Sequence, residues 1–138
     1  LPTAKLTESY IDRAIVASGG MVGRANLTRC VLGVRSIVSD GCKLENVVMM
    51  GADHYERDSV RVEKRDRLGL PALGVGENST VANAIIDKNA RIGKDVRLSP
   101  EGCEDGWVDE SKGLFVRDGV LVVLKDAVVP DGTVAGSE

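Results

Sequence analysis

A repeat at a fixed spacing is the feature that most constrains this chain. Four apolar residues each have an apolar counterpart 54 positions later, giving the pairs Leu27 and Val81, Leu32 and Ile86, Val38 and Ile92, and Leu44 and Leu98. Within each copy the apolar residues recur mostly every six positions, with one five-residue step at the same place in both. We interpret the offset of 54 as three times eighteen, which predicts coils of three six-residue segments.

A period of six differs from the 3.6 of a helix and the 2 of a simple strand. It is typical of short straight strands joined by tight turns, in which each hexad points one branched residue into a thin axial core. Asn, Gly and Asp at the hexad edges, as in residues 89–95, supply turns with positive φ. The sequence therefore predicts an all-β fold, a left-handed parallel β-helix of hexapeptide repeats. The alternative is a β-sandwich with irregular strands.

The composition agrees with a narrow core. The 138 residues include only one Trp, two Tyr and one Phe, and large rings do not fit inside a triangular prism of branched side chains. A chain of this length can bury one good core but not two. We therefore expect residues 1–138 to form a single β-helix domain.

Residues 53–71 break the hexad pattern and predict a short helical insertion. Asp53 and Glu56 are spaced as a capping box, with Asp53 as N-cap, and the charged stretch from Glu56 to Arg67 can then be helical before Gly69 and Pro71. A metal site built from Asp53, His54, Glu56 and Asp58 is a poorer interpretation. Ligands on one local helix do not converge on a tetrahedral or octahedral ion.

Residues 99–118 form the second interruption, which we expect to be a loop. Ser99-Pro100-Glu101-Gly102 is typical of a turn, and the run that follows is acidic. Trp107 lies in this segment, where a lone Trp is more often a packing anchor than a platform for a ligand. The coil is expected to resume at Phe115-Val116.

Charge and cysteine content exclude several classes of protein. The net charge is −3, so the chain lacks the basic footprint of a nucleic-acid-binding domain. No apolar run approaches the roughly 20 residues of a membrane helix, so we expect a soluble domain without a membrane partner. Cys30, Cys42 and Cys103 have no zinc-like spacing and their number is odd, which favours partly buried free thiols.

No catalytic constellation stands out in the sequence. His54 is the single histidine, and it lies in the first insertion, so a triad has only one possible base. The stretch Gly74-Val75-Gly76-Glu77-Asn78-Ser79 begins like a dinucleotide-binding motif but ends in Ser and continues as hexads rather than as a helix. We predict no catalytic residue and no metal ligand in this segment.

Two lysines form the one pattern that suggests a ligand. The stretch around Lys88 in IIDKNARI resembles that around Lys125 in VVLKDAVV, at an offset of 37, which we interpret as two coils plus one residue. Equivalent corners of neighbouring layers lie roughly 4.8 Å apart, where two ammonium groups repel unless an anion joins them. Lysine suits phosphate or carboxylate. The alternative is two solvated lysines neutralised by Asp87 and Asp126.

The chain as a whole resembles the C-terminal domain of glucose-1-phosphate adenylyltransferase of the plant, algal and cyanobacterial type. The resemblance covers nearly the whole chain and is carried by VRS at 34–36, MMGADHYE at 49–56, GVGEN at 74–78, IIDKNARIG at 85–93, VLKDA at 123–127 and DGTV at 131–134. The residues from Ser99 to Trp107 depart from the family's usual stretch. The opening Leu1-Pro2 and the MMGAD motif resemble the sequences of large, regulatory subunits more than those of small subunits.

The resemblance implies that this segment belongs to a longer enzyme of starch or glycogen biosynthesis. An N-terminal catalytic domain, absent from this chain, would hold ATP, Mg²⁺ and glucose 1-phosphate and form ADP-glucose and pyrophosphate. In similar proteins the two lysines bind the activator 3-phosphoglycerate, with phosphate as the inhibitor. This assigns an allosteric anion site to Lys88 and Lys125, with Asp87 beside them, and no cofactor to the segment itself.

The same resemblance implies partners and a location. The partners are phosphorylated small-molecule effectors, the protein's own catalytic domain and the other subunits of a homo- or heterotetramer. The location is the plastid for a plant or algal protein and the cytoplasm for a cyanobacterial one. Two alternatives stay open: a non-catalytic β-helix subunit of a nucleotidyltransferase-like exchange factor, and a hexapeptide acyltransferase using His54.

Overall fold

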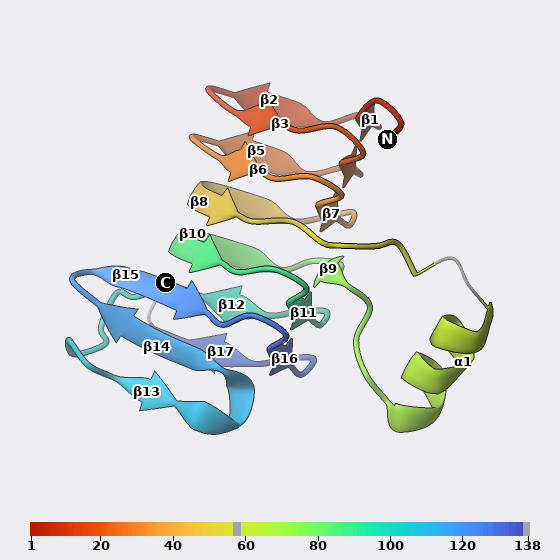
Figure 1. Cartoon of the computed structure of the whole chain (residues 1–138). Coiled ribbons are helices and arrows are strands. Elements are labelled where there is room, and N and C mark those ends of the chain that lie inside the picture. The colour runs from red at the N-terminus through yellow and green to blue at the C-terminus, as the bar shows by residue number, and fades with distance from the viewer. Residues whose placement is uncertain (57–58, 137–138) are drawn as a thin grey trace.

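The computed structural model describes residues 1–56 and 59–136, which wind into the stacked coils of a parallel β-helix with three faces (Figure 1). Face 1 is a parallel sheet of six strands. In stacking order they are β1 (Lys5–Leu6), β4 (Met21–Val22), β7 (Ile37–Val38), β9 (Gly74–Val75), β11 (Arg91–Ile92) and β16 (Val128–Val129).

Faces 2 and 3 share their two longest strands. Face 2 consists of β2 (Tyr10–Asp12), β5 (Asn26–Thr28), the first half of β8 (Lys43–Met49), the first half of β10 (Thr80–Ile86), β12 (Arg97–Leu98) and β17 (Val134–Ala135). Face 3 consists of β3 (Ile15–Val16), β6 (Val31–Leu32), the second halves of β8 and β10, and β15 (Val120–Val123). The all-β parallel prediction is therefore confirmed.

The corner between faces 2 and 3 lies inside β8 and β10. Asn46 and Asn83 have φ of 56° and 51° there, in the left-handed region that Asn tolerates better than most residues. The side-chain amide of Asn46 donates a hydrogen bond of 2.8 Å to Oδ1 of Asn83 in the next coil. One left-handed residue thus turns the chain without ending the strand.

Each uninterrupted coil takes 16 or 17 residues, and the predicted eighteen was wrong. Tyr10 pairs with Asn26 and Asn26 pairs with Lys43, which are steps of 16 and 17. The next partner of Lys43 is Thr80, 37 positions on, because this coil contains the helical insertion. The 54-residue offset is therefore one coil of 17 followed by one of 37. The five-residue step in the apolar pattern explains why a plain coil has 17 residues.

The axial core is built from branched aliphatic side chains, one from each face in each coil. Its most deeply buried members include Leu27, Leu44, Val81 and Leu98 on face 2, Val38, Val75, Ile92 and Val129 on face 1, and Leu32, Ile86 and Val123 on face 3. No aromatic residue belongs to this buried set among the described residues. Cys30 and Cys42 are buried free thiols, as predicted, and burial raises the pKa of each.

The first insertion carries the helix α1 (Ser59–Leu68), which lies beside the lower coils in Figure 1. It begins later than predicted, and Asp53 is not its N-cap. Asp53 precedes the helix by six residues, and its carboxylate binds Asn89 and Lys88 instead. The capping-box prediction was wrong because both of its acidic side chains bind partners more than ten residues away in the sequence.

The second insertion is more ordered than the predicted loop. It contains β13 (Val108–Asp109), the 3₁₀ turn η1 (Glu110–Lys112) and β14 (Leu114–Arg117). β14 pairs antiparallel with both β13 and β15, so Phe115-Val116 does not resume the coil, which restarts at β15. Trp107 packs against the core from this insertion, which confirms its prediction as an anchor.

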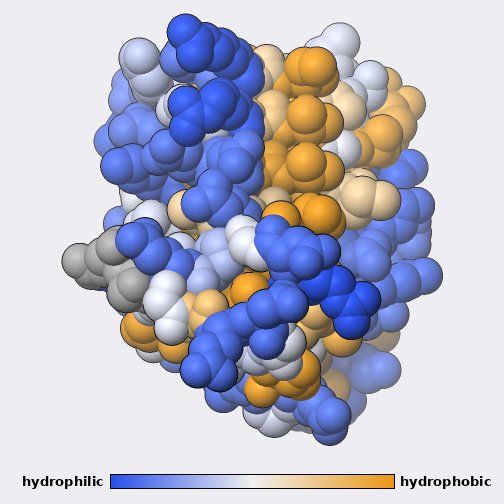
Figure 2. All heavy atoms as spheres, turned by 90° about the vertical axis from the view of Figure 1, so that its left-hand side faces the viewer, coloured by the Kyte–Doolittle hydropathy of each residue, from blue (hydrophilic) through white to orange (hydrophobic). Residues whose placement is uncertain are grey.

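The outer side of face 3 carries a row of exposed aliphatic side chains that we call the aliphatic ladder. Its members are Ile15, Val31, Val48, Ile85 and Val122, which are Cα partners in successive coils. The first four are 39–65% exposed. Figure 2 shows a hydrophobic band along the upper part of the stack. Contiguous rows of exposed aliphatic side chains are typical of interaction surfaces.

Candidate anion-binding site

Lys88 and Lys125 lie at the same corner of neighbouring coils, where face 3 turns into face 1. The pairing of Ile85 with Val122 fixes this register, and the backbone N–H of Asp126 donates a hydrogen bond of 3.0 Å to the carbonyl of Lys88. The predicted juxtaposition is confirmed. The offset of 37 is one coil containing the second insertion, so the interpretation as two coils plus one residue was wrong.

The corner is shaped by short polar residues that follow each strand. Asn89 and Asp126 come directly after the lysines and have φ of 60° and 61°. The carboxylate of Asp87 accepts the backbone N–H of Lys88 at 2.7 Å. Asp87 therefore stabilises the turn that presents Lys88. It does not form an ion pair with either lysine in the described part of the chain.

Asp53 is the acidic residue that the structure brings to this corner and that the sequence interpretation missed. Its Oδ1 accepts from Lys88 Nζ at 3.3 Å and its Oδ2 from the Asn89 amide at 3.0 Å, while its own N–H donates to Asn89 Oδ1 at 2.9 Å. The hydrogen bonds from Asn89 and Lys88, together with the charges of Lys88 and Lys125, hold the pKa of Asp53 below its usual value.

Lys125 is the less constrained cation of the pair. Its side chain is exposed, and no ion pair joins it to another residue within 1–56 and 59–136. Asp53, paired with Lys88 and close enough to feel the charge of Lys125, only partly balances two ammonium groups. Asp87 and Asp126 also belong to this corner, so the positive charge is local to the Lys125 ammonium group, which has no ion-pair partner among the described residues.

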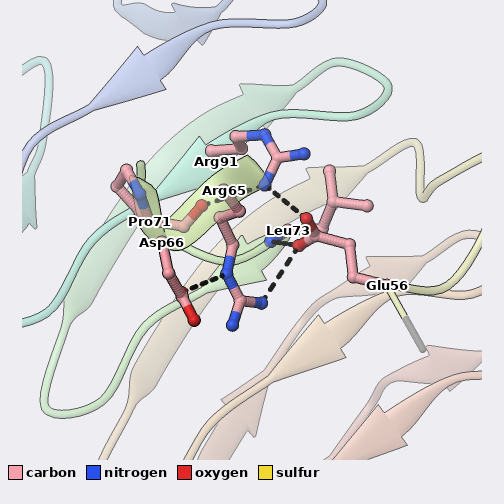
Figure 3. A network of polar contacts seen from close by, with 6 residues as sticks. All are labelled: Glu56, Arg65, Asp66, Pro71, Leu73 and Arg91. Atoms are coloured by element: carbon pink, nitrogen blue, oxygen red, sulfur yellow. Dashed lines mark hydrogen bonds and ion pairs between the residues drawn. The ribbon is translucent and has the colours of Figure 1, made fainter. Parts of the chain in front are cut away.

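The base of the helical insertion is fixed by a second polar cluster a few residues away (Figure 3). The buried carboxylate of Glu56 lies between two guanidinium groups, 2.8 Å from Arg91 Nη1 and 3.5 Å from Arg65 Nη1. It also accepts the backbone N–H of Leu73 at 2.8 Å. Burial raises the pKa of Glu56, but these hydrogen bonds and charges outweigh it and leave the pKa below its usual value.

The other candidate residues are not assembled for catalysis. His54 is half-buried beside α1, and Asp58 lies outside the described residues. Gly74 and Gly76 are coil positions in and after β9. Within the described ranges no three His, Cys, Asp or Glu side chains are grouped to hold a metal ion. No described helix is long and apolar enough to span a membrane.

Three faces of short parallel strands, hexad spacing and helical or antiparallel insertions at the coil corners define the class of hexapeptide β-helix domains. The family model of the GLGC left-handed parallel beta-helix domain matches residues 1–134. The chain belongs to this family, and the predicted left-handed fold is confirmed.

A comparison with known proteins gives a named relative. The chain is 34% identical over 134 residues to the glucose-1-phosphate adenylyltransferase small subunit, chloroplastic/amyloplastic, of Triticum aestivum. The match covers 97% of this chain and 28% of that protein, so the chain spans little more than a quarter of its relative's length. This relative is a small subunit, and the motif preference for a large subunit stays a prediction.

Proposed function

We propose that this chain is the C-terminal regulatory and oligomerisation part of an enzyme that converts ATP and glucose 1-phosphate to ADP-glucose and pyrophosphate. Family membership supports the β-helix part of such an enzyme, and the relative carries that activity in its name. In this proposal ATP and Mg²⁺ are held by the catalytic domain of the same enzyme. The segment alone is expected to be inactive.

The proposed regulatory role rests on one observation, the juxtaposition of Lys88 and Lys125 at the same corner of neighbouring coils. Two in-register lysines with a single acidic partner form a site for a small phosphorylated anion such as 3-phosphoglycerate or phosphate. An effector regulates an enzyme only when it binds one conformation better than another. We infer that the anion also contacts the catalytic domain, and that this second contact differs between the active and inactive states.

The proposed partners follow from the rest of the surface. The exposed aliphatic ladder is expected to be buried in the assembled protein. We assign it to a contact with the remainder of the same enzyme, within one subunit or between subunits of a tetramer. The relative is chloroplastic or amyloplastic, which supports a plastid location for a plant or algal source.

The regulatory role is tested in the full-length enzyme by Lys88→Glu and Lys125→Glu. Each change replaces an attractive charge with a repulsive one, so the concentration of 3-phosphoglycerate needed for half-maximal activation should rise at least about tenfold. Lys43→Glu, an exposed charge reversal on face 2, is the matched control and should leave activation unchanged. Unchanged activation in both corner variants would refute the assignment.

A further inference from the structure

A second, more basic surface lies between α1 and β11. A groove of about 320 Å³ there is lined by Arg61, Lys64 and Arg65 of the helix and by Arg91 of face 1, with His54 and Glu56 at its base. Four cationic side chains therefore face one carboxylate among the described lining residues, in a chain whose net charge is −3. Neither Lys88 nor Lys125 lines this groove.

The fold uses only part of this positive charge. Glu56 binds Arg65 and Arg91, and Asp66 also binds Arg65 at 3.2 Å, so the two inner guanidinium groups are already partly compensated. The exposed Arg61 and Lys64 have no acidic partner within residues 1–56 and 59–136. Concentrating like charges destabilises the domain unless an anion joins them, so these two residues are not explained by stability.

The inner arginines are also pre-organised for a ligand. Both described hydrogen bonds of the Arg91 side chain are donated by Nη1, to the Glu56 carboxylate at 2.8 Å and to the carbonyl of Pro71 at 3.0 Å. Its Nε and Nη2 donors make no hydrogen bond to the residues drawn in Figure 3. A guanidinium fixed in place loses little freedom when it binds, and its planar donors match the oxygens of a phosphate.

We propose that this groove is a second anion site, separate from the Lys88–Lys125 corner, which binds the phosphate group of a small molecule. Arg91 and Arg65 would contact the phosphate oxygens from the base of the groove, and Arg61 and Lys64 would close over it from α1. The ligand is either inorganic phosphate or a phosphate monoester, since both present the same dianionic group. The site does not depend on the enzyme activity proposed above.

The test is an amide NMR titration of the chain with inorganic phosphate and, separately, with glycerol 3-phosphate, at constant ionic strength. We expect saturable shifts in α1 and around Arg91. Arg61→Gln/Lys64→Gln should weaken the groove's phosphate affinity at least about tenfold, which equals about 1.4 kcal/mol. Tighter binding of the ester identifies a monoester as the ligand, and tighter binding of phosphate identifies the free ion.

Two controls separate this site from general attraction and from the corner. Lys5→Gln/Arg67→Gln removes the same charge at exposed positions outside the groove and should change the affinity less than about twofold. Lys88→Gln/Lys125→Gln should leave the α1 shifts intact. The proposal is overturned by the absence of saturable shifts in α1, or by equal losses in the groove variant and the charge control.

Discussion

At the scale of single residues, we expect Asp53 to weaken the attraction of an anion to the proposed site at Lys88 and Lys125. Its carboxylate lies 3.3 Å from Lys88 Nζ and is oriented by a hydrogen bond that it accepts from the side-chain amide of Asn89. An incoming phosphate must therefore compete with a carboxylate that the protein itself supplies. An ordinary Asp is already ionised at neutral pH, and the lowered pKa of Asp53 keeps this competitor charged in more acidic solution as well.

Replacing Asp53 with Asn should tighten phosphate binding at this corner. Asn keeps a side-chain oxygen for the amide of Asn89 but removes the negative charge. The affinity for inorganic phosphate should rise about two- to fivefold, the range expected for one exposed ion pair. NMR titration of the Lys88 and Lys125 amides measures it. Glu104→Gln, an exposed neutralisation in the second insertion, is the control, and equal affinity in both variants would contradict the role of Asp53.

The two lysines could be found from the sequence, whereas Asp53 and Glu56 could not. Lys88 and Lys125 lie in two similar stretches, so the repeat itself brings them together. Asp53 contacts Lys88 and Glu56 contacts Arg91, and in each pair the residues are 35 positions apart in the sequence. The length of the coil between them could not be predicted from the sequence. The capping-box spacing assigned both acidic residues to a helix N-terminus. That spacing considers only residues close in the sequence, so it cannot report contacts between coils.

At the scale of elements, α1 is attached to the β-helix by charge more than by an apolar face. The helix has ten residues and none of them is buried. Isolated helices of this length are marginal in water, so contacts with the coils must stabilise it. The ion pairs of Glu56 with Arg91 and Arg65, together with its hydrogen bond to Leu73, join the two ends of the insertion to face 1.

Glu56→Gln should therefore destabilise the domain in a pH-dependent way. At neutral pH the free energy of unfolding should fall by about 2 kcal/mol, since hydrogen bonds to charged groups contribute roughly 1.5–3 kcal/mol. The folded pKa of Glu56 is lowered, so its contribution is complete above the ordinary Glu pKa of about 4.3 and is lost as the pH falls through the lower folded value.

Urea unfolding of both proteins from neutral to acidic pH measures this difference. Asp66→Asn is the control, because the exposed Asp66 also binds Arg65, at 3.2 Å, and should cost less than about 1 kcal/mol. A difference between wild type and Glu56→Gln that stays constant as the pH falls would show that Glu56 acts through packing rather than through its charge.

The period of the apolar residues predicted the class of fold but not the length of its coils. The 54-residue offset is a multiple of eighteen by coincidence, because it adds a plain coil to one enlarged by α1. The second insertion shows a related limit. The alternation in Leu114–Arg117 suits either strand direction, and only the antiparallel pairing with β15 shows that the coil has not yet resumed.

At the scale of the whole molecule, the strands of face 3 carry two kinds of aliphatic side chain. Those on the inner side form the core of the domain, and those on the outer side form the aliphatic ladder. The core side chains of the same strands, such as Leu32 and Ile86, are already buried to 0 and 1% exposure. The ladder residues on the opposite side of those strands, Val31 and Ile85, are exposed to 45 and 39%. Their aliphatic character therefore adds little to folding and supports the proposed burial of this surface on assembly.

Val48→Glu, at the centre of the ladder, distinguishes these two roles. In the isolated chain Val48 is 41% exposed, so the free energy of unfolding should change by less than about 0.5 kcal/mol. In the full-length protein a buried carboxylate without a partner should weaken assembly at least about tenfold, as sedimentation velocity would show by the loss of the larger species. Thr80→Glu, exposed on face 2, introduces the same charge away from the ladder and should leave assembly intact.

If Val48→Glu also leaves the assembly unchanged, the ladder faces solvent in the whole protein and another face of the β-helix must join the subunits. If it unfolds the isolated chain, the ladder is part of the domain's own stability instead.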